Sequence, residues 1–269
     1  MVAVIKKVDL LVSHAAQLVT VSGNSGAPKR GRGMSEIGVI PDGAVAARDG
    51  VIIDVGTTEE VLGRTELAED GVLVDATGKV VLPGLVDPHT HLIFAGSRQH
   101  EFEMKIRGKG YLEILAAGGG ILNTVKATRA ATCDELIAVG EKYLGEMLTH
   151  GTTTAEVKSG YGLTPEDEIK MLEAVRRLQT RQPVELVPTF LGAHAVPPEY
   201  RDNPDGFVEL VNNEMLPEVA RRGLAEFCDV FCEEGVFSVE QTRRILLAAR
   251  HHGFKLKIHA DEIVPLGGA

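Results

Sequence analysis

The chain has 269 residues, of which 44% are hydrophobic, and its formal net charge at pH 7 is −10. This length suits one large domain, or one large and one small domain. The negative charge argues against nucleic acid and against an anionic membrane surface as partners, because both are polyanions. Three cysteines are too few for a disulfide framework and suit a reducing compartment. No segment resembles a secretory signal or approaches the roughly 18 apolar residues of a membrane span, so we expect a cytoplasmic protein.

Residues 1–78 predict a small β domain, part of a β-sandwich. Short apolar runs bounded by turn residues predict strands at 8–11, 18–21, 44–47, 51–55 and 72–75. Asp49-Gly50 lies between two of these runs and favours a tight hairpin turn, because such a turn needs positive φ. The intervening stretch 22–38 is rich in Gly, Ser, Pro and basic residues and predicts a flexible surface loop.

Residues 79–269 predict alternating strands and helices. The expected strands cover 80–86, 151–157, 186–191, 229–231 and 255–259. Helix starts are indicated by capping patterns at Thr132, at Thr164 before a proline, and at Ser238. Such alternation is typical of βα units with a parallel sheet. The pattern yields five units, whereas a closed barrel of this kind needs eight.

The strongest local motif is His89-Thr90-His91, at the end of the strand predicted over 80–86. Side chains two residues apart on a strand project to the same face, so both imidazoles can reach one metal ion while Thr90 points away. Zinc and ferrous iron both accept imidazole nitrogen. The alternative is a chance histidine pair, and such a pair alone would bind metal only about one time in three.

Three later strand ends carry similar chemistry, namely Lys158 to Gly162 with Tyr161, then His194, then His259 with Glu262. Each of these alone would more often be a structural turn or an exposed loop. Structural histidines have no reason to gather at the same end of successive strands, so their joint occurrence favours an active site. Arg98 is equally well interpreted as a carboxylate clamp or as a surface charge. Gly118-Gly119-Gly120 predicts a flexible loop, and Cys228 and Cys232 predict buried thiols.

Longer blocks around these residues resemble the imidazolonepropionase family of the amidohydrolase superfamily. They are Leu82 to His91, Phe94 to Met104, Ala117 to Ile121, Lys158 to Leu163, Phe190 to Pro198 and Ile258 to Glu262. The resemblance implies a (β/α)8 TIM barrel, here about its first five units over 79–269. It also implies metal-dependent hydrolysis of the imidazolone ring C–N bond, converting 4-imidazolone-5-propanoate to N-formimidoyl-L-glutamate in histidine degradation.

The resemblance further implies roles for individual residues. His89, His91 and His259 would bind one divalent ion, Zn²⁺ or Fe²⁺. Arg98 and Tyr161 would hold the small anionic substrate, and Glu262 would contact both the substrate and the attacking water. His194 would polarise the ring carbonyl and stabilise the developing oxyanion. The family also suggests a homodimer.

The sequence departs from the family pattern after the fifth predicted strand. The family carries a further ligand aspartate and another catalytic histidine there, but no histidine follows His259 and no aspartate follows Asp261. We therefore expect a fragment of a longer gene product, with weak metal binding and little activity by itself. Two alternatives remain open: another amidohydrolase, such as a deaminase or cyclic-amide hydrolase, and an inactive scaffold.

Overall fold

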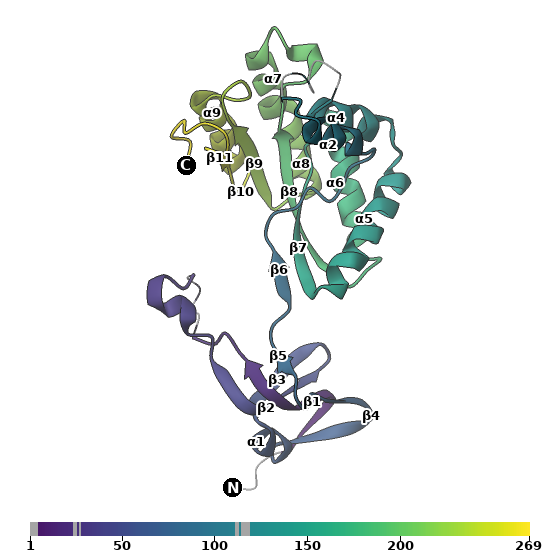
Figure 1. Cartoon of the computed structure of the whole chain (residues 1–269), viewed down its shortest axis with the longest axis vertical. Helices are drawn as coiled ribbons and strands as arrows, with labels where there is room; N and C mark the ends of the chain where they lie inside the picture. The colour runs from purple at the N-terminus through teal and green to yellow at the C-terminus, as the bar shows by residue number, and fades with distance from the viewer. Residues whose placement is uncertain (1–4, 24–25, 27, 111–112, 114–118) are drawn as a thin grey trace. The chain divides into compact units, whose positions relative to one another are not determined.

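The computed structural model describes residues 5–23, 26, 28–110, 113 and 119–269, so Gly118 of the predicted glycine loop lies outside the described residues. The chain divides into two compact units, Met1–Gly84 and Leu85–Ala269, each with its own sheet (Figure 1). The single strand predicted over 80–86 is instead two short strands, β5 (Val80–Val81) in the first sheet and β6 (Leu85–Asp87) in the second. Pro83-Gly84 lies between them, and proline cannot donate to a strand ladder.

The first unit contains β1 (Lys6–Val19), β2 (Val39–Arg48), β3 (Val51–Thr57), the short helix α1 (Thr58–Leu62) and β4 (Thr65–Asp75). The strand order is β3-β2-β1-β4, with β2 antiparallel to both of its neighbours and β4 parallel to β1. The predicted β-sandwich part is one mixed sheet among the described residues of this unit. Val61 of α1 packs on Val8, Leu11, Ala44 and Ala46 of that sheet.

The strands predicted at 8–11 and 18–21 are parts of one long strand, β1, with a break in register between Val12 and Ala15. His14 adopts φ 57° at that break, which explains why the apolar alternation is interrupted there. The hairpin turn predicted at Asp49-Gly50 is confirmed, since both residues have positive φ and Arg48 pairs with Val51. The loop predicted over 22–38 contains a 3-10 helix, η1 (Gly31–Ser35).

The second unit is a parallel sheet covered by helices. Its strands are β6, β7 (Thr152–Lys158), β8 (Glu185–Ala193), β9 (Phe227–Cys232), β10 (Lys255–Leu256) and β11 (His259–Ala260). The order is β10-β9-β8-β7-β6, and β11 also pairs with β9, so β10 and β11 together occupy one strand position. The five parallel units predicted from the sequence are therefore present.

The helices of this unit are α2 (Gln99–Ile106), α4 (Ile121–Ala130), α5 (Cys133–Thr149), α6 (Pro165–Gln179), η2 (Pro198–Tyr200), α7 (Pro204–Leu210), the π-helical turn η3 (Val211–Met215), α8 (Leu216–Arg222) and α9 (Val239–His251). The caps predicted at Thr132, Thr164 and Ser238 are confirmed, because each side chain accepts a backbone N–H of the first helical turn. Helices α2 and α4 were not predicted, and both begin without a side-chain cap.

Two apolar clusters hold the helices against the parallel sheet. One contains Phe190, Phe207 and Phe237, and the other contains Ile93, Leu136 and Leu178. Full burial of a side chain of this size contributes about 1.5–3 kcal/mol each, so these clusters fix where the strand ends lie. Cys228 and Cys232 are buried free thiols, as predicted. Among the described residues, no helix combines the length and the apolar character that a membrane crossing requires.

Candidate metal centre

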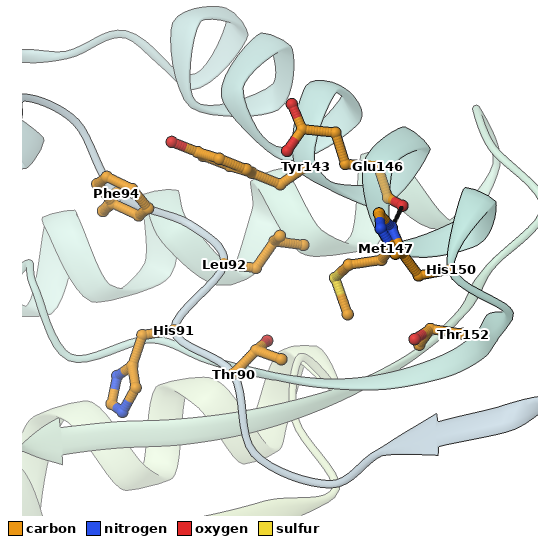
Figure 2. Close-up of a pocket in the computed structure, with 9 residues that line it drawn as sticks. All are labelled: Thr90, His91, Leu92, Phe94, Tyr143, Glu146, Met147, His150 and Thr152. Atoms are coloured by element: carbon orange, nitrogen blue, oxygen red, sulfur yellow. Dashed lines mark hydrogen bonds between the residues drawn. The ribbon is translucent and has the colours of Figure 1, made fainter.

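His89 and His91 lie directly after β6, and Thr90 between them fixes their position. The Thr90 hydroxyl donates to the carbonyl of Glu156 on β7, and the Thr90 carbonyl accepts the backbone N–H of Lys158 at 3.0 Å. Leu92 is buried on the side of α5, whereas the His91 ring points away from it, toward the sheet's carboxyl edge (Figure 2). The strand expected to carry this pair ends at Asp87, so the direction of Thr90 follows from its hydrogen bond to β7 and not from strand alternation.

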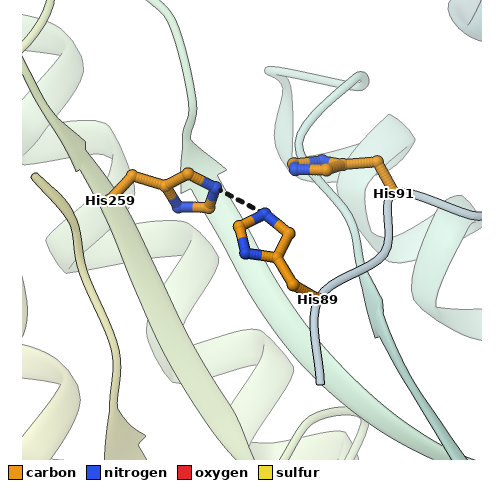
Figure 3. Close-up of side chains that lie close together, drawn as sticks. All are labelled: His89, His91 and His259. Carbon is orange, nitrogen blue, oxygen red and sulfur yellow. Dashed lines mark hydrogen bonds between the residues drawn. The ribbon is translucent and has the colours of Figure 1, made fainter. Parts of the chain in front are cut away.

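The side chains of His89, His91 and His259 converge (Figure 3). Each offers one ring nitrogen, and the three nitrogens all lie within 4.8 Å of one another. The Nε2 atoms of His89 and His259 are 3.0 Å apart. Tetrahedral zinc with Zn–N bonds of 2.0–2.1 Å keeps two ligand nitrogens about 3.3 Å apart, so this spacing fits a shared metal ion.

The lowered pKa values of His89 and His91 also fit a metal ion. Burial lowers the pKa of His91 to about 3, and burial together with the nearby His259 lowers the pKa of His89. Neutral imidazoles are the form that binds metal. The Nδ1 atom of His91 is buried and has no hydrogen-bond partner among the described residues. A donor set of three imidazoles suits zinc or ferrous iron, and it suits hard cations such as Mg²⁺ poorly.

A cavity of 290 Å³ opens beside the three histidines. It is lined by His89, His91, His194, Phe231, His259 and Glu262. Glu262 belongs to the loop after β11, and the buried carboxylate of Glu233 holds that loop. The Glu233 carboxylate accepts hydrogen bonds from the backbone N–H groups of Glu262, Ile263 and Val264 at 3.1, 2.9 and 3.2 Å. The structure thus brings Glu262 to the cavity through a side chain that sequence reasoning missed.

His194 follows β8, and its Nδ1 atom lies 2.9 Å from the carbonyl oxygen of Gly160. A carbonyl can only accept, so Nδ1 carries the proton and Nε2 is bare in the neutral ring. Burial lowers the pKa of His194 to about 4, which keeps the ring neutral near pH 7. A neutral His194 cannot donate from Nε2, so the predicted oxyanion role would need a second proton on the ring.

Tyr161 lies beside the histidines, with its ring centroid 5.8 Å from that of His91 and 5.2 Å from that of His194. Burial raises its pKa, so the phenol remains a neutral hydrogen-bond donor. Tyr161 belongs to the loop after β7. The buried carboxylate of Glu168 holds this loop by accepting hydrogen bonds from the backbone N–H groups of Gly160, Gly162 and Leu163. Arg98 is exposed, immediately before α2, and does not line the cavity.

Sequence reasoning also missed a buried charge network under the cavity. It consists of Glu156, Lys158, Asp229 and Lys257, and the first three are at most 3% exposed. One sequence feature could have revealed the network. Glu156 and Lys158 lie two residues apart in a strand whose other residues are apolar or β-branched, so both charged side chains project to the same buried face. Nothing in the sequence connected them to Asp229, which lies 71 residues further on.

Comparison with known proteins supports the resemblance seen in the motifs. Residues 72–108 match the model of an amidohydrolase family. The chain is 55% identical over 262 residues to an imidazolonepropionase of Alkaliphilus oremlandii (strain OhILAs), covering 97% of this chain and 62% of that protein. An imidazolonepropionase of Geobacillus kaustophilus (strain HTA426) is 54% identical over 97% of this chain and 62% of its own length. The chain thus spans about 62% of the length of these curated relatives.

The fold is similar to that of solved barrel enzymes. An adenosine deaminase from Xanthomonas campestris, solved with bound Zn, superimposes with a TM-score of 0.61 at 15% sequence identity. The match covers 96% of this chain and 50% of that one. At this identity the likeness concerns the fold, and it confirms the predicted class, a βα barrel arrangement of which this chain forms five strand positions.

Proposed function

We propose, from the similarity of this chain to imidazolonepropionases, that it carries the metal-binding part of an enzyme that opens an imidazolone ring. The reaction would convert 4-imidazolone-5-propanoate and water to N-formimidoyl-L-glutamate. The observation that carries this proposal is the convergence of His89, His91 and His259 at the edge of a cavity that Glu262 also lines. Three imidazoles beside a carboxylate are the parts of a metal-assisted hydrolysis.

His89, His91 and His259 would hold one divalent ion, either Zn²⁺ or Fe²⁺. A bound ion of this kind lowers the pKa of water from about 15.7 toward 7 and so supplies a nucleophile at neutral pH. The Glu262 carboxylate would orient the water, take its proton and pass that proton to the departing ring nitrogen. Its loop is held by Glu233, which sets the direction from which the carboxylate approaches.

The remaining residues would bind and orient the substrate. Tyr161, as a neutral phenol, would donate a hydrogen bond, and Arg98 would reach the propanoate carboxylate from the exposed start of α2. His194 presents a bare Nε2, so we propose that it accepts a hydrogen bond from a ring N–H of the substrate. The homodimer and the cytoplasmic location remain predictions.

A direct test measures metal content and turnover together. In line with the expectation from the sequence, we expect weak metal binding and slow loss of 4-imidazolone-5-propanoate, with both abolished in His259→Ala. The matched control is His251→Ala, an exposed histidine on α9, which should keep metal and activity. Metal retained by His259→Ala at the level of the unmodified protein would overturn the ligand assignment.

A substrate panel separates this function from the other amidohydrolase reactions. Ring substrates with and without a carboxylate tail should differ in KM, because only the former gives Arg98 a partner. Release of ammonia from an amino-substituted ring, without opening of the imidazolone ring, would favour a deaminase instead.

A further inference from the structure

Asp229 is a buried acid directly behind one of the three converging histidines. It lies on β9, is 1% exposed, and its Oδ2 atom is 2.9 Å from Nδ1 of His259. The opposite nitrogen of the same ring, Nε2, is the atom that faces His89 at 3.0 Å. The imidazole of His259 is therefore placed between a carboxylate on one side and the metal centre on the other.

Lys158 holds this carboxylate in place. Its ammonium group is 2.7 Å from Oδ2 of Asp229 and 2.9 Å from Glu156, and it is 2% exposed. Lys257 lies 2.6 Å from Glu156, so the network contains two acidic and two basic side chains and its formal charges cancel. A buried carboxylate without such a partner would carry a large desolvation cost. Asp229 can therefore remain ionised behind His259.

An ionised carboxylate accepts hydrogen bonds and cannot donate them, which restricts the proton position on the neighbouring ring. Nδ1 of His259 makes no formed hydrogen bond among the described residues, but Oδ2 of Asp229 is the acidic oxygen that faces it at 2.9 Å. A His259 ring that carries one proton would therefore hold it on Nδ1 and leave a lone pair on Nε2. That lone pair is directed at the space shared with His89 and His91. The contact between the Nε2 atoms of His89 and His259 needs one proton, and this arrangement places it on His89 when no metal is bound.

We propose that Asp229, paired with Lys158, is a positioning residue that fixes the Nδ1–H tautomer of His259 and so directs its Nε2 to the metal. Carboxylates behind metal-binding histidines act in this way in many sites, and their loss lowers metal affinity roughly 10–100-fold. The inference rests on the metal binding of the proposed function. The tautomer itself can be measured without any metal, so the two can fail separately.

The decisive variant is Asp229→Asn, which keeps the size of the side chain and removes its charge. Because Lys158 donates to the same Oδ2 atom that faces Nδ1, the amide oxygen of asparagine would take that place and leave Nδ1 with a neutral and therefore weaker acceptor. The measurement is the ¹⁵N chemical shift pattern of the His259 ring in metal-free protein, followed by titration with Zn²⁺. At a pH where the ring carries one proton, we expect a bare Nε2 in the unmodified protein, a partly protonated Nε2 in the variant, and a Kd for Zn²⁺ raised roughly 10–100-fold.

Glu156→Gln is the matched control. It makes the same change of carboxylate to amide in the same buried network, but Glu156 does not contact His259. The control should leave the His259 tautomer unchanged even where it alters stability. A protonated Nε2 on His259 in the unmodified protein would overturn the proposal, whether or not the variants fold. An unchanged tautomer or an unchanged Kd in folded Asp229→Asn would overturn it as well.

Discussion

Two loops at the carboxyl edge of the parallel sheet are held in the same way, yet their surroundings differ. Glu168 accepts three backbone N–H groups of the loop after β7, which carries Tyr161. Glu233 accepts three of the loop after β11, which carries Glu262. Burial raises the pKa of Glu168, whereas the N–H groups of Ile263 and its neighbours lower the pKa of Glu233.

The difference lies in what covers each loop. Gly160, Gly162 and Leu163 are buried with their anchor, so the first loop is part of the core. Glu262 and Ile263 are exposed, and water can reach their backbone once Glu233 releases it. An identical hydrogen-bonding device therefore contributes to stability at the first loop, whereas at the second it mainly determines where a functional side chain lies.

The largest expected effect is on stability, in Glu168→Ala. This change leaves three buried N–H donors without an acceptor, at about 1–3 kcal/mol for each donor. We expect a loss of several kcal/mol in the free energy of unfolding, measured by urea titration with circular dichroism. Glu168→Gln, which restores one acceptor, should recover part of the loss. An unfolding midpoint equal to that of the unmodified protein would show that the first loop is not part of the core.

In Glu233→Ala the expected effect is on activity and local motion. The freed N–H groups can bind water, so the unfolding midpoint should fall much less than in Glu168→Ala. Misplacement of a reacting group by about 1 Å can cost roughly 100-fold in rate, and we expect a fall of that order in kcat with little change in metal content. Hydrogen exchange at residues 262–264 should accelerate at the same time. A kcat unchanged in the folded variant would contradict the role of Glu233 in placing Glu262.

The sequence was sufficient to predict the features that depend on local pattern. The caps at Thr132, Thr164 and Ser238 and the hairpin turn at Asp49-Gly50 follow from neighbouring residues, and the structure contains all four. The grouping of His89 with distant strand ends followed from the rule that parallel strands end at one edge. Its assignment as a metal site remains a prediction.

The features that the sequence missed depend on contacts between distant residues. Glu233 reaches 29 residues along the chain to Glu262, and Asp229 meets Lys158 over 71 residues. Buried carboxylates look like surface charges in a sequence until the strands that cover them are placed. The proton position on His194 likewise depends on one carbonyl, that of Gly160, which no residue pattern reveals.

The smallest expected effect belongs to one member of a pair of glycines, one in each loop. Gly160 has φ +107°, and a Cβ there would lie 2.8 Å from the Leu191 carbonyl and 2.9 Å from Nδ1 of His194. Gly267 has φ +71° with nothing within 4 Å of such a Cβ. Gly267→Ala should therefore cost only about 1–2 kcal/mol of backbone strain.

Gly160→Ala adds a collision to that strain and pushes His194 away from its carbonyl partner. We expect it to lower the unfolding midpoint more than Gly267→Ala and to change the ¹⁵N shifts of the His194 ring, which Gly267→Ala should leave unaltered. Equal losses in the two variants would mean that the loop after β7 yields as readily as the loop after β11. The contrast between a buried and an exposed loop would then no longer explain how the two acids act.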